Sequence, residues 1–535
     1  MPAPVWSQNA GGEVLYNGIV LPTPWPPRRR SITTIPERAP YLASPPDVIK
    51  IDIGRQLFVD DFLIEESSLY RRFHQATYHP SNPVLAPVRD WERRDPYAVT
   101  TGTAPSPAAM VFSDGVFYDP AQKLFKMWYM AGYQQHTALA VSPDGITWER
   151  PAYDVVAGTN IVSTQGRDSS TVWLDLDDPD PRARYKMAAY DLNLKALRLS
   201  QSGDGVHWRE MTRSGPCGDR STMFRNPFRR VWTFSLRADA PNSLYRFRRY
   251  AETKDFLSAA WTETEPVAWT SADRLDIQRP DLKTDPQIYN LDAVGYESLM
   301  LGLFNMYRGE RPDREKPNDL CVAFSRDGFH WSRENRQPFI PVSERQGEWN
   351  WANVQSAGGV CTVVGDRLHF YVSGRQGIPG TGLPGECSTG LATLRRDGFA
   401  SLGDRWPAGV PRQVSATPAR LTTRPVTFTG RHLFLNANID GDIRVEVLDA
   451  AGRVIEPYTS ERSVPVTGDA TRLPVTWRGR STLDELRGDT VRFRFTLTRA
   501  ELFAFWVSPA PGGHSRGFLA AGGPGYARHE DVGSA

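Results

Sequence analysis

Three acidic residues, Asp168, Asp219 and Glu348, each stand just before a run of apolar and β-branched residues that is typical of a strand. Acids brought close together by the fold shift each other's pKa, so that one keeps its proton and another acts as a base. Such a pair can hydrolyse a glycosidic bond, because one acid protonates the leaving oxygen while the other activates water or attacks directly. We therefore predict these three residues as catalytic.

Polar and aromatic residues near the acids are candidate substrate contacts. Aromatic faces pack on the C–H surfaces of sugars, and arginine binds hydroxyl or carboxylate oxygens. Segment 101–105, at the equivalent place in the first repeat, has no carboxylate, and an acid from an earlier segment could fill that place. The predicted substrate-binding residues are Asp60, Asp61, Arg220, Tyr289, Asn290 and Trp349. Each aspartate also has a structural alternative, since aspartate at the start of a strand often caps a turn.

A repeat predicts how these residues are brought together. The pattern Ser-x-Asp-Gly-x-x-Trp begins at Ser142, Ser202 and Ser325, and a copy without the tryptophan surrounds Asp397. Asp-Gly between strand-like runs is a strong hairpin signal, and the tryptophan can pack between neighbouring sheets. The spacing implies one further copy near residue 265, and hence five units of roughly 60–70 residues with four strands each. This predicts an all-β chain with a five-bladed β-propeller, whose inner strands surround a central funnel.

The remaining segments predict a second domain and two appendages. Residues 1–50 are Pro-rich and predict an extended arm, and 51–411 form the propeller, with 56–65 as the strand that closes the ring. Residues 412–509 alternate apolar and polar side chains, which predicts a β-sandwich. The Gly-rich residues 510–535 predict a flexible tail.

Composition excludes several classes. With 63 Lys+Arg, 61 Asp+Glu and a net charge of +2, the chain has no global field for nucleic acid, and we expect no nucleic-acid partner. No apolar run is long enough for a membrane span, and no signal peptide is visible, so we expect no membrane partner and a cytoplasmic location. The four cysteines form neither a disulfide framework nor a zinc motif, and the nine histidines show no metal-ligand spacing. We expect no cofactor, although a structural calcium in the funnel stays open.

This architecture resembles the five-bladed propeller glycoside hydrolases of the arabinanase and invertase-like superfamily, which includes families 32 and 43. The runs 16–28, 54–65 and 82–87 further resemble a group of bacterial glycosyl-hydrolase-like propeller proteins. The resemblance implies three acids: an Asp base or nucleophile, a second Asp that tunes the site, and a Glu acid. Because the invertase Asn-Asp-Pro-Asn signature is absent, these roles pass to Asp168, Asp219 and Glu348 by their positions ahead of strands.

The sequence therefore predicts a glycoside hydrolase, exo-acting on an arabinofuranosyl, fructofuranosyl or galactofuranosyl unit of a glycoside or oligosaccharide. The main alternative is a carbohydrate-binding propeller without turnover, which the missing first-repeat acid favours. A protein-interaction scaffold is a third hypothesis, and it predicts a funnel without clustered acids. The sugar, the linkage, the choice between exo and endo action, the stereochemical course, the acid of the first repeat, a bound metal and the oligomeric state stay open.

Overall fold

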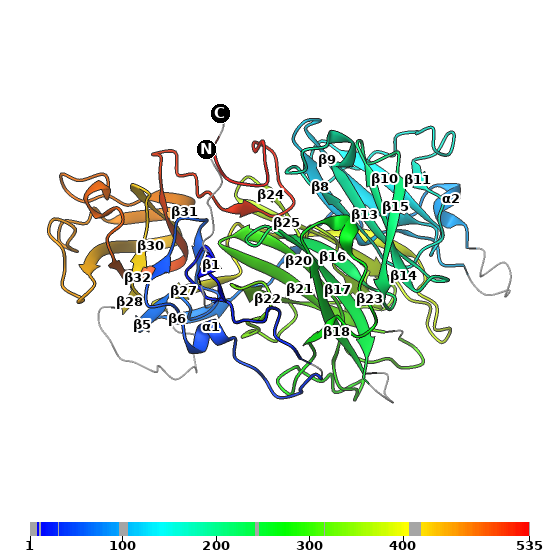
Figure 1. Cartoon of the computed structure of the whole chain (residues 1–535), viewed down its shortest axis with the longest axis horizontal. Coiled ribbons are helices and arrows are strands. Elements are labelled where there is room, and N and C mark those ends of the chain that lie inside the picture. Colours follow the sequence, from blue (N-terminus) through cyan, green and yellow to red (C-terminus); the bar gives the residue numbers. More distant parts are fainter. Residues whose placement is uncertain are drawn as a thin grey trace.

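The computed structural model describes residues 8–9, 12–29, 31–95, 105–240, 245–314, 316–405 and 419–533. Strands dominate these ranges, and the α-helices in them, α1 (Pro40–Ala43) and α2 (Asp90–Arg93), have four residues each. Short 3₁₀ turns are η1 (Pro181–Ala183), η2 (Phe256–Ser258) and η3 (Asp484–Leu486). The all-β class is confirmed, and Figure 1 shows a large propeller beside a smaller β domain.

The first three blades are four-stranded antiparallel meanders, as the repeat predicts. Blade 1 consists of β8 (Ala109–Asp119), β9 (Leu124–Ala131), β10 (His136–Ser142) and β11 (Ile161–Ser163). Blade 2 consists of β12 (Ser170–Leu174), β13 (Tyr185–Asp191), β14 (Ala196–Ser202) and β15 (Arg209–Pro216). Blade 3 consists of β16 (Thr222–Asn226), β17 (Val231–Asp239), β18 (Arg246–Thr253) and β19 (Val267–Thr270).

Blades 4 and 5 each recruit a strand from an end of the chain. Blade 4 consists of β20 (Gln287–Glu297), β21 (Leu299–Tyr307) and β22 (Asn318–Ser325), with β33 (Phe518–Leu519) paired to β20. Blade 5 consists of β23 (Asn353–Gln355), β24 (Thr362–Val364), β25 (Arg367–Arg375) and β26 (Cys387–Arg395), with β7 (Thr77–Tyr78) outside β26. The inner strands meet at the axis, since β8 contacts β12 and β24, β12 contacts β16, and β16 contacts β20. The five-bladed propeller is confirmed.

The Asp-Gly turns form as predicted and join neighbouring blades. In the turn after β10, Asp144 Oδ1 accepts the backbone N–H groups of Ile146 and Thr147, both at 2.8 Å. Gly145 in this turn has φ +73°, the left-handed region that a side chain disfavours. Tyr371 of blade 5 donates its hydroxyl to the Gly145 carbonyl at 2.8 Å. The repeat thus encodes the contact between blades as well as the turn.

The second domain is one hydrogen-bonded system of ten strands. Its C-terminal strands are β28 (Ala419–Thr423), β29 (Val426–Thr427), β30 (His432–Asp449), β31 (Val466–Pro474) and β32 (Val491–Ser508). It also contains β3 (Ile49–Lys50), β4 (Gln56–Leu57), β5 (Ile64–Ser67), β6 (Tyr70–Phe73) and β27 (Ala400–Gly403). The alternating burial along β32 agrees with the period-two pattern that predicted a β domain here.

The prediction that residues 56–65 form the strand that closes the propeller is wrong. Within 56–65, β4 pairs with β32 and β5 pairs with β28, so this segment belongs to the second domain. The outer strand of blade 5 is instead β7, where Tyr78 lies opposite Ala392. The segment's apolar pattern marks a buried strand, but it does not specify which sheet the strand joins.

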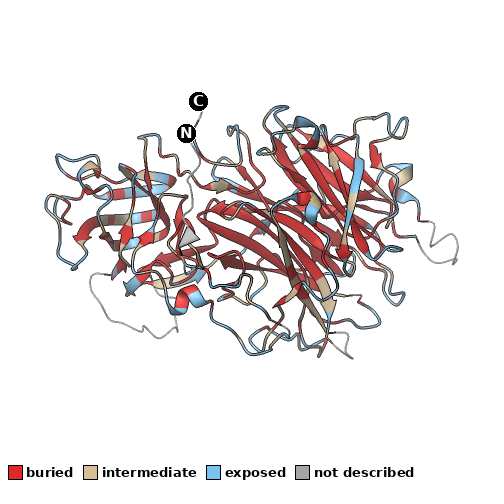
Figure 2. Cartoon of the chain, viewed as in Figure 1, coloured by how far each residue is buried: buried red, intermediate tan, exposed pale blue. Residues whose placement is uncertain are grey.

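Described segments near both ends of the chain contact the propeller. The arm contains β1 (Gln8–Asn9) and β2 (Gly12–Glu13), and the Tyr16 ring stacks on Phe228 of blade 3 with centroids 4.3 Å apart. The predicted tail is not free: β33 pairs with β20, and the Asp531 N–H donates to the Gly517 carbonyl at 2.9 Å. Figure 2 shows that the blades are buried over most of their length, with exposure concentrated in the loops.

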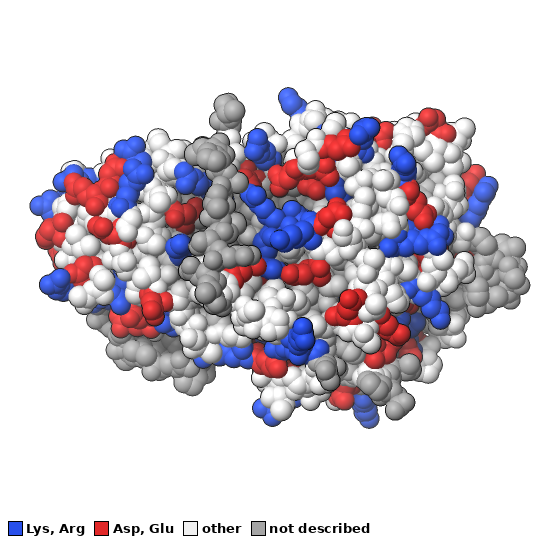
Figure 3. Space-filling model, viewed as in Figure 1, with Lys and Arg blue, Asp and Glu red and all other residues white. Residues whose placement is uncertain are grey.

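Surface charge follows the balanced composition. Figure 3 shows basic and acidic side chains interspersed over the visible face, in keeping with the net charge of +2. Within the described ranges, no helix is long and apolar enough to cross a membrane. Cys217 is partly buried, and Cys321, Cys361 and Cys387 are buried.

Candidate active site

Polar side chains from four blades are joined by hydrogen bonds at the propeller axis. Arg220, just before β16, donates from Nη2 to the Ser113 hydroxyl of β8 at 3.1 Å. Asn290 of β20 donates to the same hydroxyl at 3.2 Å. Ser356, just after β23, donates to Asp292 Oδ2 of β20 at 2.5 Å. Residues distant in sequence thus meet at the axis, as the propeller hypothesis requires.

Asp168 lies at this axial cluster, immediately before β12, and only 8% of its surface is exposed. Its Oδ1 accepts the Ser169 N–H at 2.8 Å, and its Oδ2 accepts the Gln134 side-chain amide at 3.0 Å. Hydrogen bonds donated to both oxygens fix the orientation of this carboxyl group. Asp168 is therefore held in a fixed position at the axis.

Asp292 is a second carboxyl group at the cluster, with different surroundings. Its Oδ2 accepts from Asn290 at 3.0 Å and from Ser356, while Oδ1 has no partner among the described residues. Burial raises the pKa of Asp292, although the Ser356 hydroxyl and the Arg220 and Arg248 guanidinium groups oppose this shift. A buried carboxyl group with a raised pKa and one unengaged oxygen is suited to donate a proton.

A third carboxyl group, Asp114, is fully engaged by an arginine. Arg167 donates from Nη1 and Nη2 to the two Asp114 oxygens at 2.7 and 2.8 Å. Burial raises the pKa of Asp114 to about 6 despite this pair. Asp114 lies in an irregular part of β8, where the register with β9 shifts between Met110 and Gly115. We assign Asp114 to holding Arg167, whose Nε donates to the Asp168 carbonyl at 2.9 Å.

Aromatic and basic residues surround the partly exposed side of the cluster. The Tyr289 ring lies 4.5 Å from the Arg246 guanidinium and 5.8 Å from that of Arg220. Tyr133, after β9, accepts from Arg375 Nη1 at 3.5 Å. Tyr133 and Tyr289 are both partly exposed and offer flat faces of the kind that sugars pack on.

Two of the predicted catalytic acids lie outside this cluster. Asp219 forms an ion pair with Arg237, and its side chain is 35% exposed. Glu348 accepts from the Ser343 hydroxyl within its own loop and is 41% exposed. Of the three predicted acids, the structure places only Asp168 at the axis. Position ahead of a strand was an insufficient criterion, because the loop there can turn the side chain away from the axis.

Three predicted substrate contacts are also placed elsewhere. Asp60 is buried in an ion pair with Arg326 Nη2 at 2.9 Å, and Asp61 pairs with Arg71 at 2.5 Å. The Trp349 ring fills the space above Gly374 and Gly390 of blade 5, where an added Cβ would lie 2.3 and 2.1 Å from it. These residues join or pack the structure. Arg220, Tyr289 and Asn290 do lie at the axial cluster.

The sequence contained a signal for the missed acid. Asn290 and Asp292 are two residues apart in β20, an otherwise apolar strand, and so share the same side of it. Two polar residues on one face of a buried inner strand indicate a polar axis. Asp114 had a misleading signal, because its Asp-Gly sequence resembles the repeated turn.

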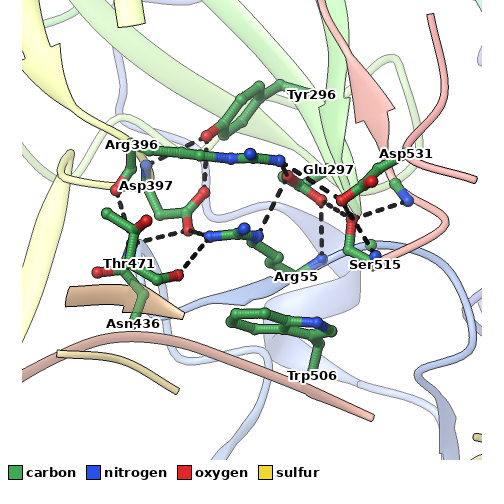
Figure 4. A network of polar contacts seen from close by, with 12 residues as sticks. Arg55, Tyr296, Glu297, Arg396, Asp397, Asn436, Thr471, Trp506, Ser515 and Asp531 are labelled. Atoms are coloured by element: carbon green, nitrogen blue, oxygen red, sulfur yellow. Dashed lines mark hydrogen bonds and ion pairs between the residues drawn. The ribbon is translucent and has the colours of Figure 1, made fainter. Parts of the chain in front are cut away.

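Glu297, at the opposite end of β20 from Asn290, belongs to a different network (Figure 4). It pairs with Arg396 at 2.8 Å and accepts the Arg55 backbone N–H at 3.1 Å. Arg55 also pairs with Asp397 at 2.9 Å and lies 4.2 Å above the Trp506 ring. This network joins the second domain to blades 4 and 5, at the end of β20 opposite the axial cluster.

Comparisons with known proteins return structures only. No protein-family model matches the chain, and no curated protein sequence matches it. A thermostable family-43 glycoside hydrolase structure shares 11% identity and a TM-score of 0.38, covering 56% of this chain and 95% of its own.

Two further structures are similar over more of the chain. A fructofuranosidase from Schwanniomyces occidentalis complexed with fructosylnystose has 11% identity and a TM-score of 0.34, covering 73% of this chain and 93% of its own. An exo-β-1,3-galactanase from Phanerochaete chrysosporium with β-1,3-galactotriose has 9% identity and a TM-score of 0.35, covering 82% and 99%. The propeller assignment itself stands on the five sheets described above.

No group of three or more His, Cys, Asp or Glu side chains in the described ranges is arranged to hold a metal ion. The axial cluster instead presents amides, hydroxyls, arginines and two carboxyl groups in different surroundings.

Proposed function

We propose that the protein is a glycoside hydrolase whose acid is Asp292 and whose base or nucleophile is Asp168. The observation that carries this proposal is the pair of carboxyl groups at one axis with opposite surroundings. Asp168 receives hydrogen bonds on both oxygens, whereas burial raises the pKa of Asp292 and leaves its Oδ1 unengaged among the described residues. Both acidic groups also act electrostatically on the same guanidinium, that of Arg220.

The reaction follows from these two states. Asp292 gives its proton to the glycosidic oxygen as the bond from that oxygen to the anomeric carbon breaks. Asp168 either takes a proton from water that attacks the anomeric carbon or attacks that carbon itself, after which water releases the sugar. The products are a free sugar and an alcohol, and water is the only co-reactant. The configuration of the first-formed sugar, followed by NMR, distinguishes the two courses.

Substrate details stay proposals on the basis of sequence. The exo-acting mode and the furanoside unit come from the family resemblance, and the partly exposed Tyr289 and Tyr133 support a sugar partner without specifying its ring size. A calcium ion in the funnel and a cytoplasmic location likewise stay predictions. A panel of nitrophenyl furanosides and pyranosides tests the ring form directly.

The two roles make different predictions for leaving groups. Asp168→Asn should lower kcat/KM by about a hundredfold or more for every glycoside cleaved, since the base is needed throughout. Asp292→Asn should cause a similar loss with alkyl or sugar leaving groups but a much smaller one with nitrophenol, which departs without protonation. Asp177→Asn, which changes an exposed aspartate in the loop between β12 and β13, is the matched control. Wild-type turnover of an alkyl glycoside by either axial variant would refute the assignment.

A carbohydrate-binding propeller without turnover is the second candidate. It is favoured by the acid set: the first blade contributes Asp114, but both oxygens of this carboxylate hold Arg167. The axis therefore presents two available acids where the related hydrolases are expected to use three. Calorimetric binding of an oligosaccharide, with no new reducing ends after a day, would support this candidate over hydrolysis.

A further inference from the structure

Arg220 is held at the axis in an unusual backbone conformation. Its φ is +55°, in the left-handed region that non-glycine residues adopt at a cost of about 1 kcal/mol or more. Arg248 of β18 donates from Nη2 to the Arg220 carbonyl at 2.8 Å and from Nη1 to the Tyr289 carbonyl at 3.2 Å. Such a conformation persists only where the surroundings fix it. The contacts around Arg220 therefore hold its backbone, and with it the start of its side chain, in this orientation despite the energetic cost.

Only one of the three guanidinium nitrogens of Arg220 donates a hydrogen bond to another described residue. The guanidinium lies 3.9 Å from the centre of the Phe112 ring and donates once, from Nη2 to Ser113. Its Nε and Nη1 are buried and have no hydrogen-bond partner among the described residues. A buried arginine nitrogen without a partner costs free energy that a ligand can recover.

Arg220 and Arg248 carry two buried positive charges that no direct ion pair neutralises among the described residues. In the described part of the chain, neither Arg220 nor Arg248 has a carboxylate within ion-pairing distance, whereas Arg167 and Arg237 nearby are paired with Asp114 and Asp219. Burial and the charge of Arg220 together lower the pKa of Arg248 to about 9. Burial likewise lowers the pKa of Arg220, despite the opposing charges of Asp168 and Asp292.

We propose that the substrate is an acidic glycoside, whose negatively charged group binds Arg220. This inference rests on the proposed function, because it places that group beside the carboxyl pair of Asp168 and Asp292. The unused Arg220 donors supply the hydrogen bonds, and the positive charge of the guanidinium supplies the electrostatic attraction. The charged group can be the carboxylate of a uronic acid or a sulfate ester, since both accept hydrogen bonds from a guanidinium. A neutral hydroxyl could accept these hydrogen bonds but would bring no opposite charge to the guanidinium.

Calorimetry with matched sugars tests the proposal on the full chain. The probes are galacturonate, galactose 6-sulfate and galactose, with glucuronate and glucose as a second matched pair. We expect an acidic sugar to bind about tenfold or more tightly than its neutral counterpart, with a preference that weakens as salt is added. Tighter binding of the sulfate or of the uronates identifies the source of the charge. Equal affinity for acidic and neutral sugars, or no binding of any acidic sugar, would overturn the proposal.

Variants at Arg220 locate the charge contact. Arg220→Gln should remove the preference for the acidic sugar while changing the affinity for the neutral one far less, and Arg220→Lys should restore part of it. Arg213→Gln, an exposed arginine of blade 2, is the matched control. Thermal melting shows whether each variant folds; if Arg220→Gln does not, the wild-type comparison and Arg220→Lys still decide the matter. An unchanged preference in folded Arg220→Gln would refute the role of this residue.

Turnover separates this inference from the proposed function. Preferred binding of acidic sugars without release of product would support the charge contact while refuting hydrolysis. Hydrolysis of neutral glycosides with no binding of acidic sugars would do the reverse.

Discussion

Replacing Arg55 by methionine should uncouple the two domains. The Arg55 guanidinium lies between two buried carboxylates, 2.9 Å from Asp397 and 3.5 Å from Glu297, and donates to the Thr471 carbonyl at 2.8 Å (Figure 4). Methionine keeps the apolar contact with Trp506 but removes one of the two arginines that face these carboxylates, leaving Arg396 and the neutral donors Tyr296, Asn436 and Ser515. Removing one partner from a buried ion pair typically costs roughly 3–5 kcal/mol. We expect a loss of this size in the free energy of unfolding.

The sign of the pH dependence makes this prediction specific. Burial raises the pKa of Glu297, and removing the nearby Arg55 charge should raise it further. When folding raises the pKa of a carboxyl group, the group does not destabilise the fold below its unfolded pKa, because it is protonated in both states. It destabilises the fold as the pH rises through its folded pKa, because the buried group must then ionise. The loss in Arg55→Met should therefore be larger at pH 8 than at pH 5.

Urea unfolding followed by fluorescence, at both pH values, measures the loss. We also expect the second domain to unfold ahead of the propeller in the variant, because the network joins them. Arg431→Met, which removes an exposed pair with Asp484, is the control and should change little. An equal loss at both pH values, or a loss no larger than that of the control, would refute the electrostatic account.

Three further predictions concern the acid, a buried histidine and a turn. Ser356→Ala removes a hydrogen bond that lowers the pKa of Asp292, so the alkaline limb of the kcat/KM pH profile should move to higher pH; an unmoved limb argues against Asp292 as the acid. Burial lowers the pKa of His369 from 6.5 to about 4. The free energy of unfolding should therefore fall by about 3 kcal/mol as the pH falls across that interval, because the buried ring must take up a proton. This loss should be absent from the unfolding curves of His369→Gln. Gly205→Ala places a Cβ 2.6 Å from a tryptophan ring of blade 1 and should lower the free energy of unfolding by about 2 kcal/mol or more. Gly158→Ala has a similar positive φ but open space around the Cβ, so it should add only backbone strain. Equal melting temperatures of the two variants would contradict this prediction.

The sequence predicted the propeller because its signals are local. An Asp-Gly turn, such as the one at Asp144, is specified by hydrogen bonds within four residues and by a glycine φ, both independent of the rest of the chain. Repetition of that turn then gave the number of blades. The prediction of the closing strand was wrong because the pairing of β4 and β5 depends on strands more than 300 residues away. An apolar run predicts a buried strand but does not specify which strand it pairs with.

The sequence predicted that polar residues meet at the axis, but it did not identify all of them. The sequence by itself determined that polar residues at the inner strands would meet, and it identified Asp168, Arg220, Tyr289 and Asn290. Only the tertiary structure decided which acid shares the axis with Asp168. Side-chain direction at a strand end depends on the loop and on nearby arginines, so Asp219 turns to Arg237, while the strand itself fixes Asp292 at the axis.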